Sequence, residues 1–140
     1  HGIEKGTAPR IRIDEELANA KTILKLIDED TDKNITAVHD VSAGRLAVAL
    51  SEMVISSKLG CEVTLEGDGL DKIQWLYSES HGRYLITVKA NVVDEILSKI
   101  DVDCKVIGEV KGDSLDINGH EFSFEDLDNA YHGVIEQYMA

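Results

Sequence analysis

The sequence has little of what several protein classes require. Its 14 Lys and Arg residues are outnumbered by 27 Asp and Glu residues, which gives a formal net charge of −13. Nucleic-acid backbones and anionic bilayers bind basic patches, so we expect no nucleic-acid partner and no membrane partner. No apolar run is long enough for a transmembrane helix and no signal peptide is recognisable, so we expect a cytoplasmic protein. Aromatic residues make up only 5% of the chain, which predicts an aliphatic core.

Metal and disulfide chemistry is equally poorly represented. The two cysteines, Cys61 and Cys104, are far apart and show no Cys-x-x-Cys spacing, so we expect two reduced, buried thiols. Asp28, Asp30 and Asp32 alternate as in a calcium loop. However, that loop would have Gly at the next position, where Lys occurs here, and a Glu seven residues after the third Asp, where His occurs. We therefore predict a solvated acidic loop and no metal site.

With 140 residues, the chain is long enough for one domain with a sizeable core. Residues 1–13, which contain the single proline, Pro9, are expected to be a linker from a missing N-terminal domain, and residues 14–140 a single domain. The first residues are His1-Gly2 and not Met, which suggests a processed protein or a fragment of a longer one.

Apolar periodicity predicts helices alternating with short strands. Helices are expected from Asp14, as a plausible N-cap, to about 27, and over 44–58, 92–100 and 125–138; strands are expected over 35–39, 61–65, 73–77, 83–88, 104–110, 115–117 and 121–124. Asn118-Gly119 between the last two strands is a strong hairpin signal. This order predicts an α+β fold of mixed α/β layers, with a mixed sheet packed by helices.

The first and last helices are each expected to bury one aliphatic stripe. The stripe of the first helix includes Leu24, and that of the last helix includes Ile135. Trp75 lies in the strand expected over 73–77, so we expect its ring to be in the core.

Two polar segments stand out at predicted strand ends. The first is His39-Asp40-Val41-Ser42-Ala43-Gly44-Arg45, between a strand and a helix, and the second is Ser78-Glu79-Ser80-His81-Gly82-Arg83 before a strand. The first segment has two compatible interpretations. Asp40 or Ser42 caps the following helix, or the segment borders a pocket for a phosphorylated ligand.

Together these segments resemble the C-terminal domain of the aminoimidazole-ribonucleotide-synthetase superfamily. Within it they are most similar to the last domain of phosphoribosylformylglycinamidine synthase, whose pattern is roughly His-Asp-Val-Ser-Asp-Gly-Gly-Leu-Ala, followed later by Ser-Glu-Ser-x-Gly-Arg. The resemblance covers essentially the whole chain and implies a fold like the C-terminal domain of aminoimidazole ribonucleotide synthetase. Carbamoyl dehydratases and selenophosphate synthetases of this superfamily have different sequences at the first turn, so this chain resembles them less than it resembles the synthase.

The resemblance implies ligand contacts without catalytic residues in this domain. The implied ligand-binding residues are Asp40, Ser42, Gly44, Arg45, Glu79, Ser80 and Arg83. Two positions depart from the family pattern, because Ala43 replaces an acidic residue and Arg45 replaces a second Gly. The loss of that glycine and of that carboxylate leaves a vestigial pocket in a stand-alone scaffold or binding domain as an alternative.

The resemblance also implies the activity of the longer enzyme. That ligase converts formylglycinamide ribonucleotide to formylglycinamidine ribonucleotide with ATP, Mg²⁺ and glutamine-derived ammonia. Its implied partners are its own N-terminal domains, a glutaminase subunit and a small bridging subunit, and a homodimer is possible. Residues 1–140 alone are expected to be inactive and to hold no cofactor.

Overall fold

The computed structural model describes residues 9–139, without the side chains of Leu70, Val134, Glu136 and Gln137. The predicted linker therefore lies outside the described residues over positions 1–8. The chain divides into two compact units, each built from two separate stretches. Unit 1 contains the residues up to Ser42 and those from Glu79 to Val102, and unit 2 contains Ala43–Ser78 and the residues from Asp103 onwards.

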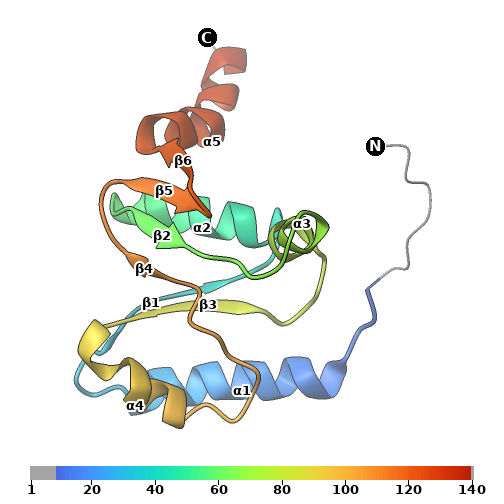
Figure 1. Ribbon diagram of the computed structural model, residues 1–140, viewed down its shortest axis with the longest axis vertical. Helices are drawn as coiled ribbons and strands as arrows, with labels where there is room; N and C mark the ends of the chain where they lie inside the picture. The colour runs from blue at the N-terminus through green and yellow to red at the C-terminus, as the bar shows by residue number, and fades with distance from the viewer. Residues whose placement is uncertain (1–8, 140) are drawn as a thin grey trace. The chain divides into compact units, whose positions relative to one another are not determined.

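Unit 1 is built around a two-stranded antiparallel ribbon. Strand β1 (Ile35–Asp40) pairs with β3 (Tyr84–Val88), and Figure 1 shows the two strands side by side. The helices of this unit are α1 (Ile13–Glu29), the 3₁₀ turn η1 (Ala90–Val92) and α4 (Val93–Ser98). Its fully buried apolar side chains are Leu26, Val41 and Ile96, which come from α1, the end of β1 and α4. The core of unit 1 is therefore small.

Unit 2 contains a four-stranded mixed sheet in the order β4-β2-β5-β6. Its strands are β2 (Cys61–Val63), β4 (Gly108–Val110), β5 (Ser114–Ile117) and β6 (His120–Ser123), and its helices are α2 (Arg45–Ser57), α3 (Leu70–Tyr77) and α5 (Phe124–Met139). Only β2 and β5 run parallel to each other. Its core is formed by apolar residues of α2, of the sheet and of the segment after β2, including Leu46, Ala49, Leu50, Val54, Val63, Leu65, Leu115 and Ile117. The predicted mixed α/β fold with an aliphatic core is confirmed.

The predicted hairpin turn is present at Asn118-Gly119. Both residues have positive φ, 55° and 82°, as a two-residue turn between twisted strands requires. The Asn118 side chain also donates to the Leu65 carbonyl and accepts from the Leu65 N–H, both at 3.1 Å. The Asn118 side chain thus forms the two bonds that a neighbouring strand's main chain would form, and it connects the hairpin to the segment after β2.

Several local predictions were wrong. Residues 73–77 form part of α3 and not a strand, because a short apolar run fits either period and Gly69 begins a helix there. Trp75 is half-buried on this helix, with Lys105 Nζ 5.7 Å from its ring centroid. The strand expected from Cys104 begins only at Gly108, and Cys104 is exposed.

The predicted buried stripes of the first and last helices are also wrong. Leu24 is 66% exposed and Ile135 is 65% exposed. Helix α1 instead turns Leu26 inward, and its N-cap is Arg12, two residues before Asp14. The sequence contains two apolar faces on α1, and periodicity does not say which one is covered by the rest of the chain.

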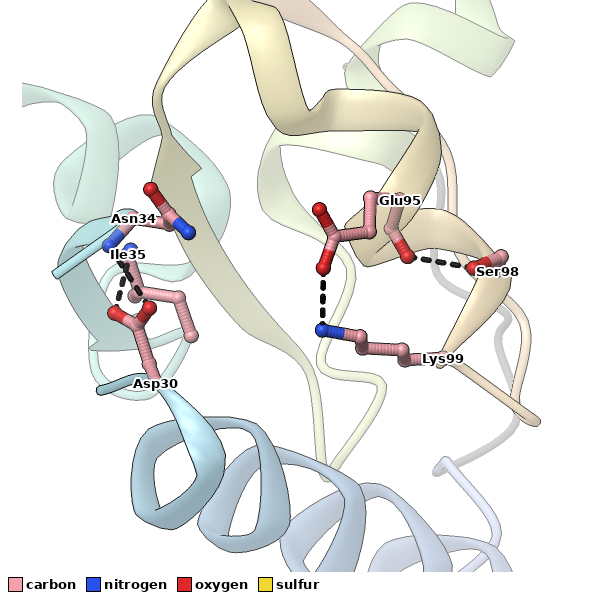
Figure 2. A network of polar contacts seen from close by, with 6 residues as sticks. All are labelled: Asp30, Asn34, Ile35, Glu95, Ser98 and Lys99. Carbon is pink, nitrogen blue, oxygen red and sulfur yellow. Dashed lines mark hydrogen bonds and ion pairs between the residues drawn. The ribbon is translucent and has the colours of Figure 1, made fainter. Parts of the chain in front are cut away.

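A carboxylate clip organises the turn between α1 and β1. Asp30 Oδ1 accepts from the Asn34 N–H and Oδ2 from the Ile35 N–H, both at 2.8 Å (Figure 2). The Ile35 and Asn34 donors hold the pKa of the Asp30 carboxyl below its ordinary value of 3.8, and Lys89 adds to this effect. The acidic run thus contains a structural turn. Figure 2 also shows the exposed ion pair between Glu95 of α4 and Lys99, the C-cap residue of that helix, at 2.7 Å.

Replacement of Leu26 by Ala is expected to lower the free energy of unfolding by about 2–5 kcal/mol, since a buried side chain is removed from a small core. The matched change Leu24→Ala, two residues earlier on the same helix, should cost less than about 0.5 kcal/mol because that side chain is mostly exposed. Urea denaturation of both variants measures the difference. Equal losses would contradict the orientation of α1.

Replacement of Asp30 by Asn should lower stability at neutral pH, because the amide offers one acceptor oxygen where the carboxylate offers two. A carboxyl whose pKa is lowered by folding stabilises the protein above its ordinary pKa and loses this contribution as pH falls through the folded-state value. The gap in urea midpoint between the two proteins should therefore shrink between pH 7 and about pH 2. The control is Asp28→Asn on the same acidic run, which should lower the urea midpoint at pH 7 by less than Asp30→Asn. A difference between the wild-type chain and Asp30→Asn that widened in acid would contradict the assignment.

Candidate functional site

The end of β1 lies directly beside the start of β3. Asp40 is opposite Tyr84 in the strand register, and the Val41 N–H donates to the Arg83 carbonyl at 2.9 Å. The antiparallel pairing therefore brings the segment ending at Ser42 next to the segment Glu79–Arg83. The sequence analysis placed both segments at predicted strand ends, and within unit 1 the strand pairing brings these two ends together.

The second segment rests on helix α1. Asn19 Nδ2 donates to the Gly82 carbonyl at 2.9 Å. Gly82 has φ +67°, and a Cβ at this position would lie 2.8 Å from Glu16 Cγ. Glu16 Oε1 is buried and has no hydrogen-bond partner within residues 9–139. Gly82 is therefore required both for its backbone conformation and for its close approach to the helix.

The candidate side chains of unit 1 differ in exposure. Asp40, Ser42 and Glu79 are exposed, whereas Ser80 and Arg83 are half-buried. Carboxylate, hydroxyl and guanidinium groups together offer acceptors and donors for a polar ligand. The structure thus places polar side chains of both kinds at one strand end of this unit.

Two residues that hold this segment were missed by sequence reasoning. Asn19 and Glu16 lie on α1, where polar side chains usually face water. Their only signal is their spacing of three residues, which places both on one helix face. Without knowledge of what covers that face, the spacing does not identify a contact with Gly82.

Gly44 and Arg45 belong to unit 2 and begin α2. Gly44 is the N-cap residue, so the interpretation of Asp40 or Ser42 as the cap is wrong. Its φ is +75°, and a Cβ there would clash with the side chain of Val48. Arg45 also has a positive φ, +64°, which is unfavourable for a residue with a side chain. This backbone explains why a Gly-Gly pair suits the turn.

The remaining candidate groups are metal-binding side chains and the two cysteine thiols. Within the described part of the chain, no three His, Cys, Asp or Glu side chains are grouped so that they could hold a metal ion. Cys61 is half-buried, and burial raises the pKa of its thiol and of the Cys104 thiol, which makes both less reactive. No helix among the described residues is long and apolar enough to cross a membrane.

Comparisons with known proteins agree with the resemblance. Residues 1–118 match the family described as AIR synthase related protein, C-terminal domain. The chain is 62% identical, over its whole length, to part of phosphoribosylformylglycinamidine synthase subunit PurL from Methanobrevibacter smithii, and 41% identical to the corresponding subunit from Methanothermobacter thermautotrophicus. It spans about a fifth of the length of each of these relatives, since the match covers 20% of each.

Solved structures show the same fold at lower sequence identity. Phosphoribosylformylglycinamidine synthase II from Thermotoga maritima superimposes with a TM-score of 0.69 at 19% identity, covering 85% of this chain and 22% of that one. T. maritima PurL complexed with FGAR gives a TM-score of 0.61 at 20% identity, covering 80% and 20%. The sequence match over residues 1–118 therefore establishes that the chain belongs to the AIR synthase related protein, C-terminal domain family.

Proposed function

We propose that this chain works as a domain of the ligase that converts formylglycinamide ribonucleotide to formylglycinamidine ribonucleotide with ATP and glutamine-derived ammonia. The observation that carries the proposal is the 62% identity of this chain to part of a PurL subunit. The main-chain bond from the Val41 N–H to the Arg83 carbonyl supports it further, because it joins the two segments that match the family pattern. Residues 14–140 act in this proposal as the C-terminal domain.

The proposed binding roles in unit 1 follow from side-chain chemistry. Glu79 accepts hydrogen bonds from the ribose hydroxyls, and Ser80 donates to or accepts from the same ligand. Arg83 lowers the electrostatic cost of the phosphate group, since a guanidinium binds phosphate oxygens in pairs. Asp40 and Ser42 border this ligand from the neighbouring strand end. The domain therefore contributes one wall of a binding site.

The reaction itself requires groups from outside this chain. Within the described part of the chain, no His, Cys, Asp and Glu side chains are grouped so that they could hold Mg²⁺. We propose that the rest of the longer polypeptide binds ATP and Mg²⁺, and that a glutaminase subunit and a small bridging subunit deliver ammonia in the cytoplasm. In this proposal the chain by itself neither hydrolyses ATP nor forms the amidine.

Replacement of the matching fifth of Methanobrevibacter smithii PurL by this chain should give an active ligase. In that chimera, Glu79→Gln should reduce kcat/KM for formylglycinamide ribonucleotide by about 10- to 100-fold, because a hydrogen bond to a charged group contributes about 1.5–3 kcal/mol. The effect should appear mainly as a raised KM, since the proposed role is binding. Steady-state kinetics with saturating ATP and ammonia measures it.

The matched control is Glu29→Gln, which changes an exposed glutamate at the end of α1 and should leave the kinetics unaltered. Equal effects of the two changes, or an unchanged KM in Glu79→Gln, would contradict the binding role. An inactive but folded chimera would favour the vestigial-pocket alternative, for which Ala43 and Arg45 are the residues to restore to the family pattern. ATP hydrolysis by residues 1–140 alone would contradict the division of labour.

A further inference from the structure

Helix α1 carries a straight apolar stripe on its exposed face. The stripe consists of Ile13, Leu17, Ala20, Leu24 and Ile27, which follow one another at alternating spacings of four and three residues. The four larger side chains are 71%, 49%, 66% and 49% exposed in chain order, and Ala20 is half-buried. The opposite face of the same helix already contributes Leu26 to the core of unit 1. The stripe is therefore additional to what the fold of unit 1 needs.

The spacing of this stripe is that of a coiled-coil seam. Apolar residues repeated every 3.5 positions let two helices interlock side chains along their length. Exposure of the apolar side chains of such a seam to water is unfavourable. They are buried most completely against another helix that has the same repeat. The stripe itself supplies such a helix when two copies of the chain meet.

Charges beside the stripe fix the direction of pairing. Asp14 and Lys21 are exposed and occupy equivalent positions, each directly after a stripe residue and seven residues apart. When two copies run antiparallel, with Leu17 opposite Ala20 of the partner, Asp14 of each copy faces Lys21 of the other. Each antiparallel pair of helices then gains two attractive charge contacts.

A parallel arrangement would use a different residue. Glu16 would then have to reach Lys21 of the partner, because parallel seams pair the positions before and after the apolar layers. Glu16 lies instead against Gly82 and its Oε1 is buried, so its carboxylate is only partly accessible to a partner helix. The contacts of Glu16 therefore favour the antiparallel arrangement.

We propose that the exposed face of α1 binds the same face of a second copy of this chain as an antiparallel, two-fold symmetric helix pair. The self-complementary placement of Asp14 and Lys21 identifies a second copy as the occupant. A two-fold interface of this kind is closed, so it gives dimers and not fibres. In this register the seam pairs only four stripe residues of each helix, Ile13, Leu17, Ala20 and Leu24, which predicts a weak dimer. The proposal concerns assembly and does not depend on the ligase role.

The first test is sedimentation of the chain from about 10 μM to about 1 mM, a range that brackets weak dimers. The wild-type chain should shift from monomer to dimer, and Leu24→Glu should raise the dissociation constant at least about tenfold. The matched control Ile73→Glu changes an apolar side chain on α3 that is 53% exposed, against 66% for Leu24, and should leave association unchanged. Circular dichroism verifies that both variants are folded.

The second test exchanges the charges. At low salt, Asp14→Lys or Lys21→Asp alone should each weaken the dimer by about 2- to 10-fold, and the double change should restore it. A monomer at every concentration, an equal effect of Ile73→Glu, or no rescue by the double change would each overturn the proposal. If the wild-type chain stayed monomeric, the occupant of the stripe would instead be a part of the longer polypeptide outside the region matched in the relatives.

Discussion

The antiparallel pairing of β1 with β3 is the constraint on which the candidate site depends. Its two strands are separated by the whole of α2, β2 and α3 in the sequence, so their contact closes a long loop. The Lys89 N–H bonds to the Asn34 carbonyl at one end of the ribbon, and the Val41 N–H bonds to the Arg83 carbonyl at the other. Between these two bonds, the register decides which polar side chains share a strand end. A slip by one residue would turn every side chain of β1 to the opposite face.

Local backbone conformation sets a second limit on the chemistry of this domain. Gly44 and Arg45 both have positive φ at the start of α2, and only glycine adopts such a conformation without cost. The positive φ of Arg45 costs about 1 kcal/mol of conformational free energy, which is a small part of the stability of a domain. A residue with a side chain keeps such a conformation only where the surrounding structure holds it in place. The chain therefore keeps the geometry of the two-glycine turn while one of the glycines has been replaced.

Sequence reasoning succeeded where the decisive physics is local. Asn118-Gly119 identified its hairpin because the turn needs two positive φ angles, and the end of β1 was marked by polar residues after an apolar run. It failed where tertiary contacts decide. Residues 73–77 are too few for their periodicity to separate helix from strand, and the choice between Leu24 and Leu26 as the inward residue of α1 depends on what covers the helix. The roles of Asn19 and Glu16 depend on Gly82, 63 and 66 positions further along the chain.

The interleaving of the two units has a consequence for how the polypeptide acquires its structure on the ribosome. Synthesis delivers α1 and β1 first, then half of unit 2, and only afterwards β3, which completes unit 1. Until β3 emerges, β1 has an unpaired edge and the apolar faces of α1 are uncovered on both sides. The second stretch of unit 2 then supplies β4, β5 and β6, so β2 remains unpaired until β4 and β5 have been synthesised. A ribosome stalled between residues 42 and 79 therefore holds two incomplete halves, each of which lacks the strands that would shield it from aggregation.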